Sequence, residues 1–309
     1  MWKFAWLVAL PLVCLVWAQE APQFRTEVNL VSVTCSVRST DGHLVHDLTR
    51  EDFEVFEDGV EQKVQFFARE SELPLRVGLI VDGSSSQGKF VKRHQHDLDV
   101  FLESVLRPND EALALGFGNH LRLLSDFSSS PDTIAQALQR YQKGSYDFPE
   151  LGPKEDRDLG TALYDALVFT IQEKFSPPGR KRKALLVFSD GEENSSEHDL
   201  LDAIETAQRT DTLIFGLRYT QMERGRLNAR NKYGIRVMDH LADQTGGAAF
   251  DLLRVDPKDA FEQISEQLRS MYEIAYASSN IQDGSYHKIT IRVKRDGMMV
   301  RAKTGYYAK

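Results

Sequence analysis

Between Leu75 and about Met271, short apolar runs with the character of strands alternate with stretches whose apolar residues recur at helical spacing. Strands that are connected through helices pair in parallel, so this alternation predicts an α/β core with helices on both faces of a doubly wound, mainly parallel sheet. One pair should be antiparallel, because only a tight turn separates its two runs. The expected strands are Val77–Val81, Ala112–Leu115, Leu121–Phe127, Ala184–Phe188, Leu213–Leu217 and Ala248–Phe250, with the antiparallel pair formed by the second and third.

The segments on either side of this core, Phe24–Glu70 and Tyr272–Lys309, have a β-rich pattern. Both contain Asp-Gly pairs, which favour hairpins because glycine tolerates the positive φ of a tight turn. A small sheet is marginal in water by itself. We therefore expect the two segments to pair into one β-sandwich-like domain that contains the α/β core as an insertion; two independent β appendages are the alternative. The expected bounds are 19–72, 73–271 and 272–309.

The amino terminus has the pattern of a secretory signal peptide over residues 1–18. Lys3 is followed by the uncharged run Phe4–Ala18, and the small residue Ala18 precedes Gln19. A retained membrane anchor is the alternative, although the run is shorter than the ~20 residues that a span needs. Lipidation of Cys14 is disfavoured because Val13 stands where a lipoprotein signal has a small residue. We expect an exported protein, whether periplasmic, on the cell surface or secreted.

Cleavage there would leave Cys35 as the one remaining cysteine, so an internal disulfide is excluded and stability must come from an ordinary core. The net charge of -8 argues against binding to the nucleic-acid backbone.

A cluster of oxygen-bearing side chains follows the first expected core strand. Asp82 stands at its carboxyl end, and Ser84 and Ser86 follow at two-residue steps. Ligands of open α/β sheets bind outside the carboxyl ends of the strands, so these side chains can converge on one point. Carboxylate and hydroxyl oxygens suit a hard cation such as magnesium rather than zinc or copper. Two other segments add matching groups: Asp190 ends the strand Leu185–Phe188, and Thr161 opens a loop that runs into a helix.

This combination of Asp-x-Ser-x-Ser, Gly-Thr at a helix start and Ser-Asp-Gly after a strand resembles the metal-ion-dependent adhesion site of von Willebrand factor type A domains. The flanking segments resemble an exported bacterial subgroup of that family, through Leu48–Phe53, Glu57-Asp58-Gly59 and Val300–Tyr307. The resemblance covers nearly the whole chain after residue 18. Gln87 is a departure, since many members have methionine there; the position is not a ligand, so we expect no effect on metal binding.

The resemblance implies a role for each residue of the site. Ser84 and Ser86 would contact the metal directly, Thr161 directly or through water, and Asp82 and Asp190 mostly through water. A cation held largely by neutral oxygens keeps a strong positive field and an exchangeable water. A glutamate or aspartate of a partner protein would replace that water. The metal would be Mg²⁺, with Mn²⁺ or Ca²⁺ as alternatives.

Other interpretations of these residues are weaker. Asp82 and Asp190 could simply cap helices. The segment Gly83–Lys89 also fits the phosphate-binding pattern Gly-x-x-x-x-Gly-Lys, but Phe90 stands where that motif needs serine or threonine. A serine hydrolase is disfavoured because Gln87 follows Ser86 where a nucleophile elbow needs glycine. We expect no enzymatic activity and no small-molecule substrate.

The smaller motifs have structural explanations. We expect His94, His96, His198 and His240 to lie in helices without a catalytic role, Asn194-Ser195-Ser196 to cap a helix near Glu197 rather than carry a glycan, and Lys181–Lys183 and Glu192-Glu193 to be solvated. The sequence thus predicts an exported, metal-dependent protein-binding module. A structural subunit of an envelope assembly, with the metal site kept for stability, is the alternative.

Overall fold

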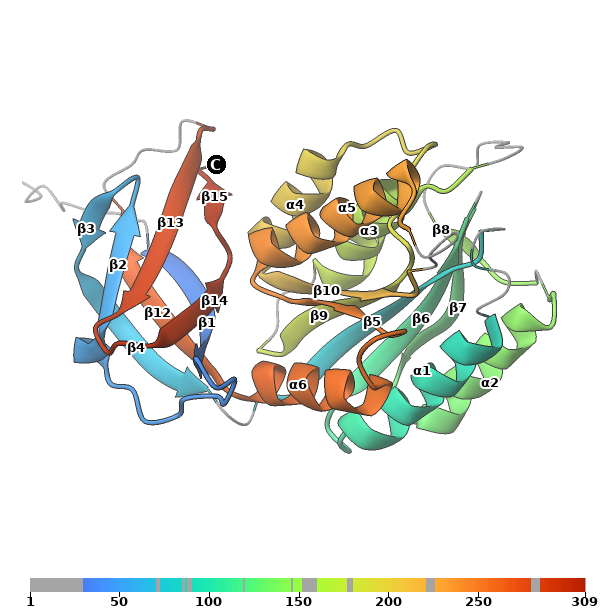
Figure 1. Cartoon of the computed structure of the whole chain (residues 1–309), viewed down its shortest axis with the longest axis horizontal. Coiled ribbons are helices and arrows are strands. Elements are labelled where there is room, and N and C mark those ends of the chain that lie inside the picture. Colours follow the sequence, from blue (N-terminus) through green and yellow to red (C-terminus); the bar gives the residue numbers. More distant parts are fainter. Residues whose placement is uncertain are drawn as a thin grey trace, which may run out of the picture.

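The computed structural model describes residues 30–70, 73–84, 87, 91–118, 120–145, 147–151, 160–176, 180–220, 226–278 and 284–308. Two units lie beside each other, a β-rich unit and a larger α/β unit (Figure 1). The expected signal peptide and the whole of 1–29 lie outside the described residues, as do Ser86 and Lys89.

A seven-stranded sheet forms the centre of the larger unit, in the order β11-β10-β9-β5-β6-β7-β8. Strands β11, β10, β9, β5 and β6 are parallel neighbours, and β7 and β8 are antiparallel to theirs. This confirms the predicted fold class, including the antiparallel pair β6–β7. The strands are β5 (Leu75–Asp82), β6 (Glu111–Phe117), β7 (Leu121–Ser128), β8 (Glu150–Leu151), β9 (Arg182–Phe188), β10 (Thr212–Arg218) and β11 (Ala249–Asp251).

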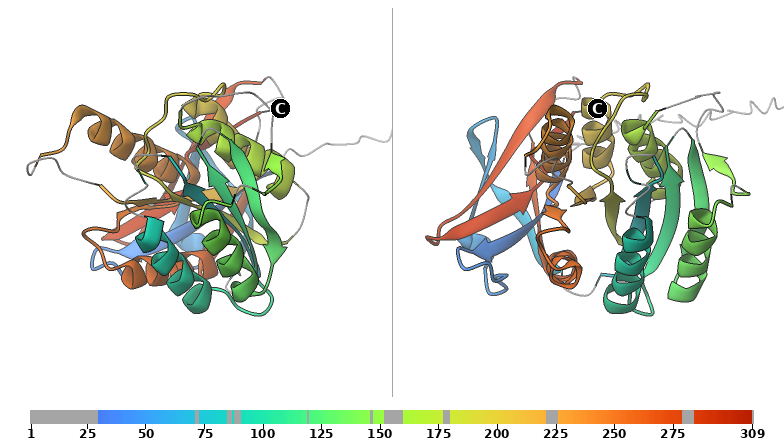
Figure 2. Two further views of the ribbon diagram at one scale, coloured as in Figure 1. Left: turned by 90° about the vertical axis from the view of Figure 1, so that its right-hand side faces the viewer. Right: turned by 45° about the vertical axis from the view of Figure 1, so that its right-hand side comes forward.

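Helices cover both faces of this sheet (Figures 1 and 2). One apolar cluster joins α1, α2 and α6 to one face, and a second joins α3, α4 and α5 to the other. Neighbouring residues of β5 divide between them, since Leu79 packs in the first cluster and Ile80 in the second. Strands buried on both sides need continuous apolar runs, which is the pattern that predicted them. The helices are α1 (Val91–Val105), α2 (Pro131–Gln142), α3 (Leu163–Thr170, continued by a π-helical turn over Ile171–Phe175), α4 (Leu200–Arg209), α5 (Ala229–Thr245) and α6 (Pro257–Arg269).

The β unit is built from both ends of the described chain. Strand β1 pairs with β12 and β14, and β2 pairs with β13, so each of its two four-stranded sheets contains strands from before and after the α/β unit. A third apolar cluster, including Cys35, Phe53 and Tyr272, fills the space between the sheets. The sheets are β14-β1-β12-β4 and β15-β13-β2-β3, with β1 (Leu30–Ser39), β2 (Phe53–Glu57), β3 (Val60–Gln62), β4 (Val64–Glu70), β12 (Met271–Ala277), β13 (Tyr286–Val293), β14 (Met298–Ala302) and β15 (Gly305–Tyr307).

Arg182 ties the two units together where the chain passes between them. Its guanidinium donates to the carbonyl of Leu268 at the end of α6, at 2.7 Å, and forms an ion pair with Glu70 of β4 at 3.0 Å. The side chain is 4% exposed, so the prediction of a solvated basic flank is wrong for this residue. A buried arginine needs such partners, because an unpaired charge in this environment is strongly unfavourable.

Candidate metal site

Asp82 and Asp190 stand at the carboxyl ends of two neighbouring parallel strands. Val81 of β5 lies opposite Phe188 of β9 in the sheet register, so each strand delivers its acid to the same edge. Between them, the hydroxyl of Ser189 donates to Oδ2 of Asp82 at 2.7 Å. Asp82 is 1% exposed and Asp190 is 8% exposed. Both carboxylates are therefore buried at the edge of the sheet where α/β proteins bind their ligands.

The loop after β5 turns sharply back on its own strand. The backbone N–H of Ser84 donates to Oδ1 of Asp82 at 2.8 Å, and that of Gly83 donates to the carbonyl of Phe117 at 2.7 Å. A side chain at Gly83 would collide with the hydroxyl of Tyr141, which explains the glycine. Ser84 is thus held beside Asp82 as the motif requires, while Ser86 lies outside the described residues.

Thr161 reaches the same edge from the start of α3. Its backbone N–H donates to Oδ1 of Asn194 at 2.8 Å, and the N–H of Asn194 donates back to the carbonyl of Thr161 at 3.2 Å. The next residue, Ala162, donates to the carbonyl of Gly118, and a Cβ built on Gly118 would lie 3.7 Å from the backbone N of Ser84. Thr161 is therefore adjacent to both candidate loops, at 6% exposure. The side chain is buried there and does not form an exposed rim of the site.

Asp190 is held from two sides. Its Oδ1 accepts from the backbone N–H of Glu192 at 3.1 Å, and its Oδ2 accepts from Nε2 of Gln87 at 2.6 Å. Gly191 has a φ of +78°, and a side chain there would collide with the carbonyl of Gly234 in α5. The turn therefore requires glycine both for its left-handed conformation and for its close contact with a helix.

The two buried carboxylates have no cationic side chain as a partner among the residues that the structure describes. Burial raises the pKa of Asp82 to about 6, and the negative charge of Asp190 adds to the effect. Burial and Asp190 also raise the pKa of Glu192. A buried negative charge without a counter-charge is unfavourable, and a hard divalent cation would supply one. The oxygen donors of this edge fit such a cation.

Glu193 is a residue whose role the sequence analysis missed. Its carboxylate accepts from the backbone N–H groups of Leu163 and Tyr164 in the first turn of α3, and from those of Ser195 and Ser196 in its own turn. It therefore replaces the N-cap side chain that α3 lacks, since Ala162 has none to offer. The prediction of a solvated residue is wrong. The sequence signal for this role has two parts. An acid closely follows Asp190, and Ala162 at the start of α3 has no side chain that could cap the helix.

Neighbouring polar residues also differ from their predicted roles. Asn194 holds Thr161 and does not cap a helix, and α4 is capped by Asp199 instead. His198 lies before α4, not in it, and its Nδ1 is 2.8 Å from Oδ1 of the buried Asp165. His96 and His240 lie in α1 and α5, as predicted, and both are exposed; the side chain of His94 lies outside the described residues.

A hydrogen-bonded chain of serine, histidine and aspartate occurs in the β unit. Ser285 Oγ lies 2.9 Å from Nε2 of His287, whose Nδ1 lies 2.7 Å from Oδ2 of Asp58. In serine hydrolases the acid of such a triad is buried and backbone N–H groups form an oxyanion hole. Here the Asp58 side chain is 46% exposed, which differs from the buried acid of such an enzyme. The chain fastens the β2–β3 turn to β13, since Asp58 also accepts from the backbone of Lys288.

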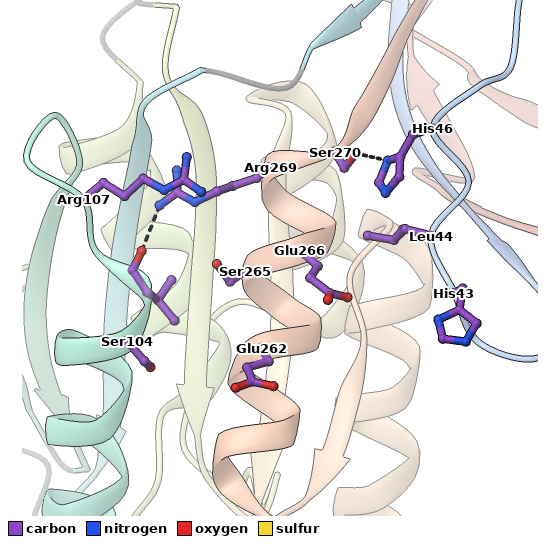
Figure 3. A pocket seen from close by; sticks show the side chains of 11 residues that line it. His43, Leu44, His46, Ser104, Arg107, Glu262, Ser265, Glu266, Arg269 and Ser270 are labelled. Carbon is purple, nitrogen blue, oxygen red and sulfur yellow. Dashed lines mark hydrogen bonds between the residues drawn. The ribbon is translucent and has the colours of Figure 1, made fainter.

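A cavity of about 490 Å³ lies at the carboxyl-terminal end of α1 (Figure 3), and none of the residues that line it belongs to the candidate metal site. It is lined by the segment containing His43 and His46, the end of α1, and α6 with Glu262 and Glu266. Arg269 closes one side by donating to the carbonyl of Val105 at 2.8 Å. No group of three or more acids, histidines or cysteines suited to a metal occurs among the described residues. The candidate site at Asp82 differs in kind, because the groups expected to complete it are serine and threonine hydroxyls.

No family model and no curated protein matches the chain. Among solved structures, it is similar to von Willebrand factor type A from Catenulispora acidiphila, at 11% identity and a TM-score of 0.48, over 92% of this chain and 74% of that one. It is similar to an aerotolerance-related membrane protein from Bacteroides fragilis, at 14% identity and 0.47, over 63% and 98%. It is also similar to the manganese-loaded TRAP protein of Plasmodium vivax, at 14% and 0.44, over 77% and 96%.

In the described part of the chain, none of the helices has the length and apolar character to cross a membrane.

Proposed function

We propose that this protein is an exported, metal-dependent protein-binding module of the von Willebrand factor type A kind. Asp82, Ser84, Ser86, Thr161 and Asp190 would hold a divalent cation, Mg²⁺ or Mn²⁺ with Ca²⁺ as a further candidate. An aspartate or glutamate of a partner protein would complete its coordination. The bound cation would supply a fixed positive charge at the edge of the sheet, and the chain's own residues position it.

The observation that supports this proposal is the pair of buried carboxylates on adjacent strand ends. Asp82 and Asp190 lie close enough for the charge of Asp190 to help raise the pKa of Asp82, and no described cationic side chain offsets them. Structural capping would not need this arrangement, since α3 and α4 receive their caps from Glu193 and Asp199 instead. Neutral hydroxyls complete the set, so the cation would retain affinity for an incoming carboxylate.

Capture of a partner in the presence of metal and chelator tests the function. The tagged protein is incubated with native envelope extract or culture fluid in magnesium, in chelator, and in chelator followed by excess magnesium. We expect specific partners in the first and third samples and none in the second. Capture that survives chelation would favour the alternative, an assembly subunit in which the metal site serves stability.

The nucleotide-binding alternative makes a different prediction. It requires ATP to bind the purified protein without any protein partner, and Lys89→Ala to abolish that binding. We expect no ATP binding by either form, because Asp82 would place a carboxylate beside the phosphates. ATP binding that Lys89→Ala removes would overturn the adhesion proposal.

A further inference from the structure

Gln87 bridges the two loops of the candidate metal site. Its backbone N–H donates to the carbonyl of Ser84 at 3.1 Å, and its side-chain Nε2 donates to Oδ2 of Asp190 at 2.6 Å. The residue is 1% exposed. The side chain therefore links the turn that carries Ser84 to the turn that carries Asp190, 103 residues later in the chain.

The contact with Asp190 determines which way the amide points. An ionised carboxylate only accepts hydrogen bonds, so the NH₂ group of Gln87 faces Asp190 and the oxygen takes the other position. Oε1 is buried and has no donor among the residues that the structure describes. A buried polar oxygen without a partner is unfavourable, and such atoms in folded proteins call for an explanation.

The surroundings of this oxygen suggest its ligand. The same amide contacts Asp190, and Asp82, whose Oδ2 accepts from the hydroxyl of Ser189, ends the neighbouring strand, so acceptors predominate at this edge of the sheet. A further hydrogen-bond acceptor at this edge is unfavourable unless the site also receives a positive charge or a hydrogen-bond donor. An amide oxygen is a hard donor of the type that magnesium, manganese and calcium prefer, and it also accepts from the water around such an ion.

We propose that Gln87 contributes to metal binding at this site, a proposal that rests on the function proposed above. Nε2 holds the carboxylate of Asp190 in position, and Oε1 is the acceptor that the site offers to a hydrated divalent cation. Asp190 keeps free acceptor capacity, because a carboxylate has about four lone-pair positions and the hydrogen bonds from Gln87 and Glu192 occupy two of them. Methionine at this position would fill the same space and provide neither group.

Titration of Mn²⁺ alone into purified protein tests this role, with calorimetry and the electron paramagnetic resonance signal of free Mn²⁺ as readouts. Gln87→Met preserves the volume and removes both amide groups. We expect affinity to fall about 10- to 100-fold, the usual effect of losing a residue that orients a ligand. The matched control is Gln267→Met, since Gln267 is also buried and donates to a backbone carbonyl, that of Gly246 at 2.8 Å, but lies in α6. Its affinity should equal that of the wild type.

A double-mutant cycle with Asp190→Asn shows whether Gln87 acts through its partner. We expect the two losses of affinity to be less than additive; fully additive losses would overturn the proposal. Binding by Gln87→Met within twofold of the wild type would also overturn it while leaving the metal site itself intact. Absence of binding by the wild type would instead contradict the proposed function. Should Gln87→Met fail to fold, Gln87→Asn, which withdraws the amide by one methylene, is titrated in its place.

Discussion

The hydroxyl of Ser189 donates to Oδ2 of Asp82 across 2.7 Å and joins the end of β9 to the end of β5. A second cross-link, from Gln87 to Asp190, runs in the opposite direction between the same two loops. Each loop therefore positions the acid of the other. The carboxylates are held at the sheet edge by neutral groups, which leaves their charge available to a cation.

Substitution of Glu193 tests whether its carboxylate acts as a clamp, holding the turn after Asp190 against the start of α3. Glu193→Ala should lower the free energy of unfolding by about 1–3 kcal/mol, because several backbone N–H groups lose their acceptor together. Urea unfolding followed by circular dichroism measures the change. Glu192→Ala is the matched control, and we expect it to stay within about 0.5 kcal/mol of the wild type. Equal midpoints for the two variants would show that Glu193 is not a clamp.

Thr161→Ala should separate binding from folding. The main chain of Thr161 makes both hydrogen bonds to Asn194, so the loop keeps its anchors when the side chain changes. We expect an unfolding free energy within about 1 kcal/mol of the wild type, from the loss of one buried methyl group, and weaker magnesium-dependent partner capture. Thr161→Ser restores the hydroxyl and should restore capture. A Thr161→Ala protein that captures its partner normally would remove Thr161 from the site.

Cys35 should be chemically inert in the folded protein. It is fully buried between the sheets of the β unit, and burial raises the pKa of its thiol to about 12. The thiolate is the reactive form, so a disulfide reagent at pH 8 should not label the folded Cys14→Ser protein. Labelling should be complete after unfolding in urea. Rapid labelling without denaturant would mean that the β unit opens readily or packs differently.

Removal of Ser285–Lys309 tests whether the two β segments depend on each other. The truncation takes away β14 from β1 and β13 from β2, which exposes unpaired strand edges and part of the third apolar cluster. We expect a shift from soluble to aggregated protein on expression. We expect limited proteolysis to cut the 30–70 segment in the truncated protein and to leave it intact in the full chain. A soluble truncation in which that segment stays protected would show independent β segments, and the domain bounds 19–72 and 272–309 would lose their basis.

The α/β core could be predicted from the sequence because the spacing of apolar residues along the chain indicates strands and helices locally. Val77–Val81 lies within β5, and Ala184–Phe188 lies within β9, since a strand buried on both faces needs an unbroken apolar run. The helical spacing of apolar residues likewise predicted the helices between the strands, and in α1 it places Leu98, Phe101 and Leu102 in the core. The positions of Asp82 and Asp190 at one edge then follow from the parallel topology.

The contacts that build the site were not predictable from local pattern. Gln87 meets Asp190 across 103 residues, and Glu193 meets Leu163 across 30. Arg182 was interpreted as solvated because nothing in its neighbours reveals the carbonyl of Leu268, 86 residues away. Each of these polar side chains has charged or polar neighbours in the sequence, so no periodic pattern of apolar residues indicates that it is buried. The resemblance to a family indicated which residue types would bind the metal, but it implied no role for Gln87 in metal binding.

Calorimetric titration of Mg²⁺ or Mn²⁺ is the most direct test of the proposed metal site. We expect saturable binding by the wild type and its loss in Asp82→Ala. Metal at about a hundred times its Kd should then stabilise the wild type by about 2.7 kcal/mol and leave Asp82→Ala unchanged. Equal metal binding by the wild type and the double variant Asp82→Ala/Asp190→Ala would contradict the account, because no cation could then depend on these two carboxylates.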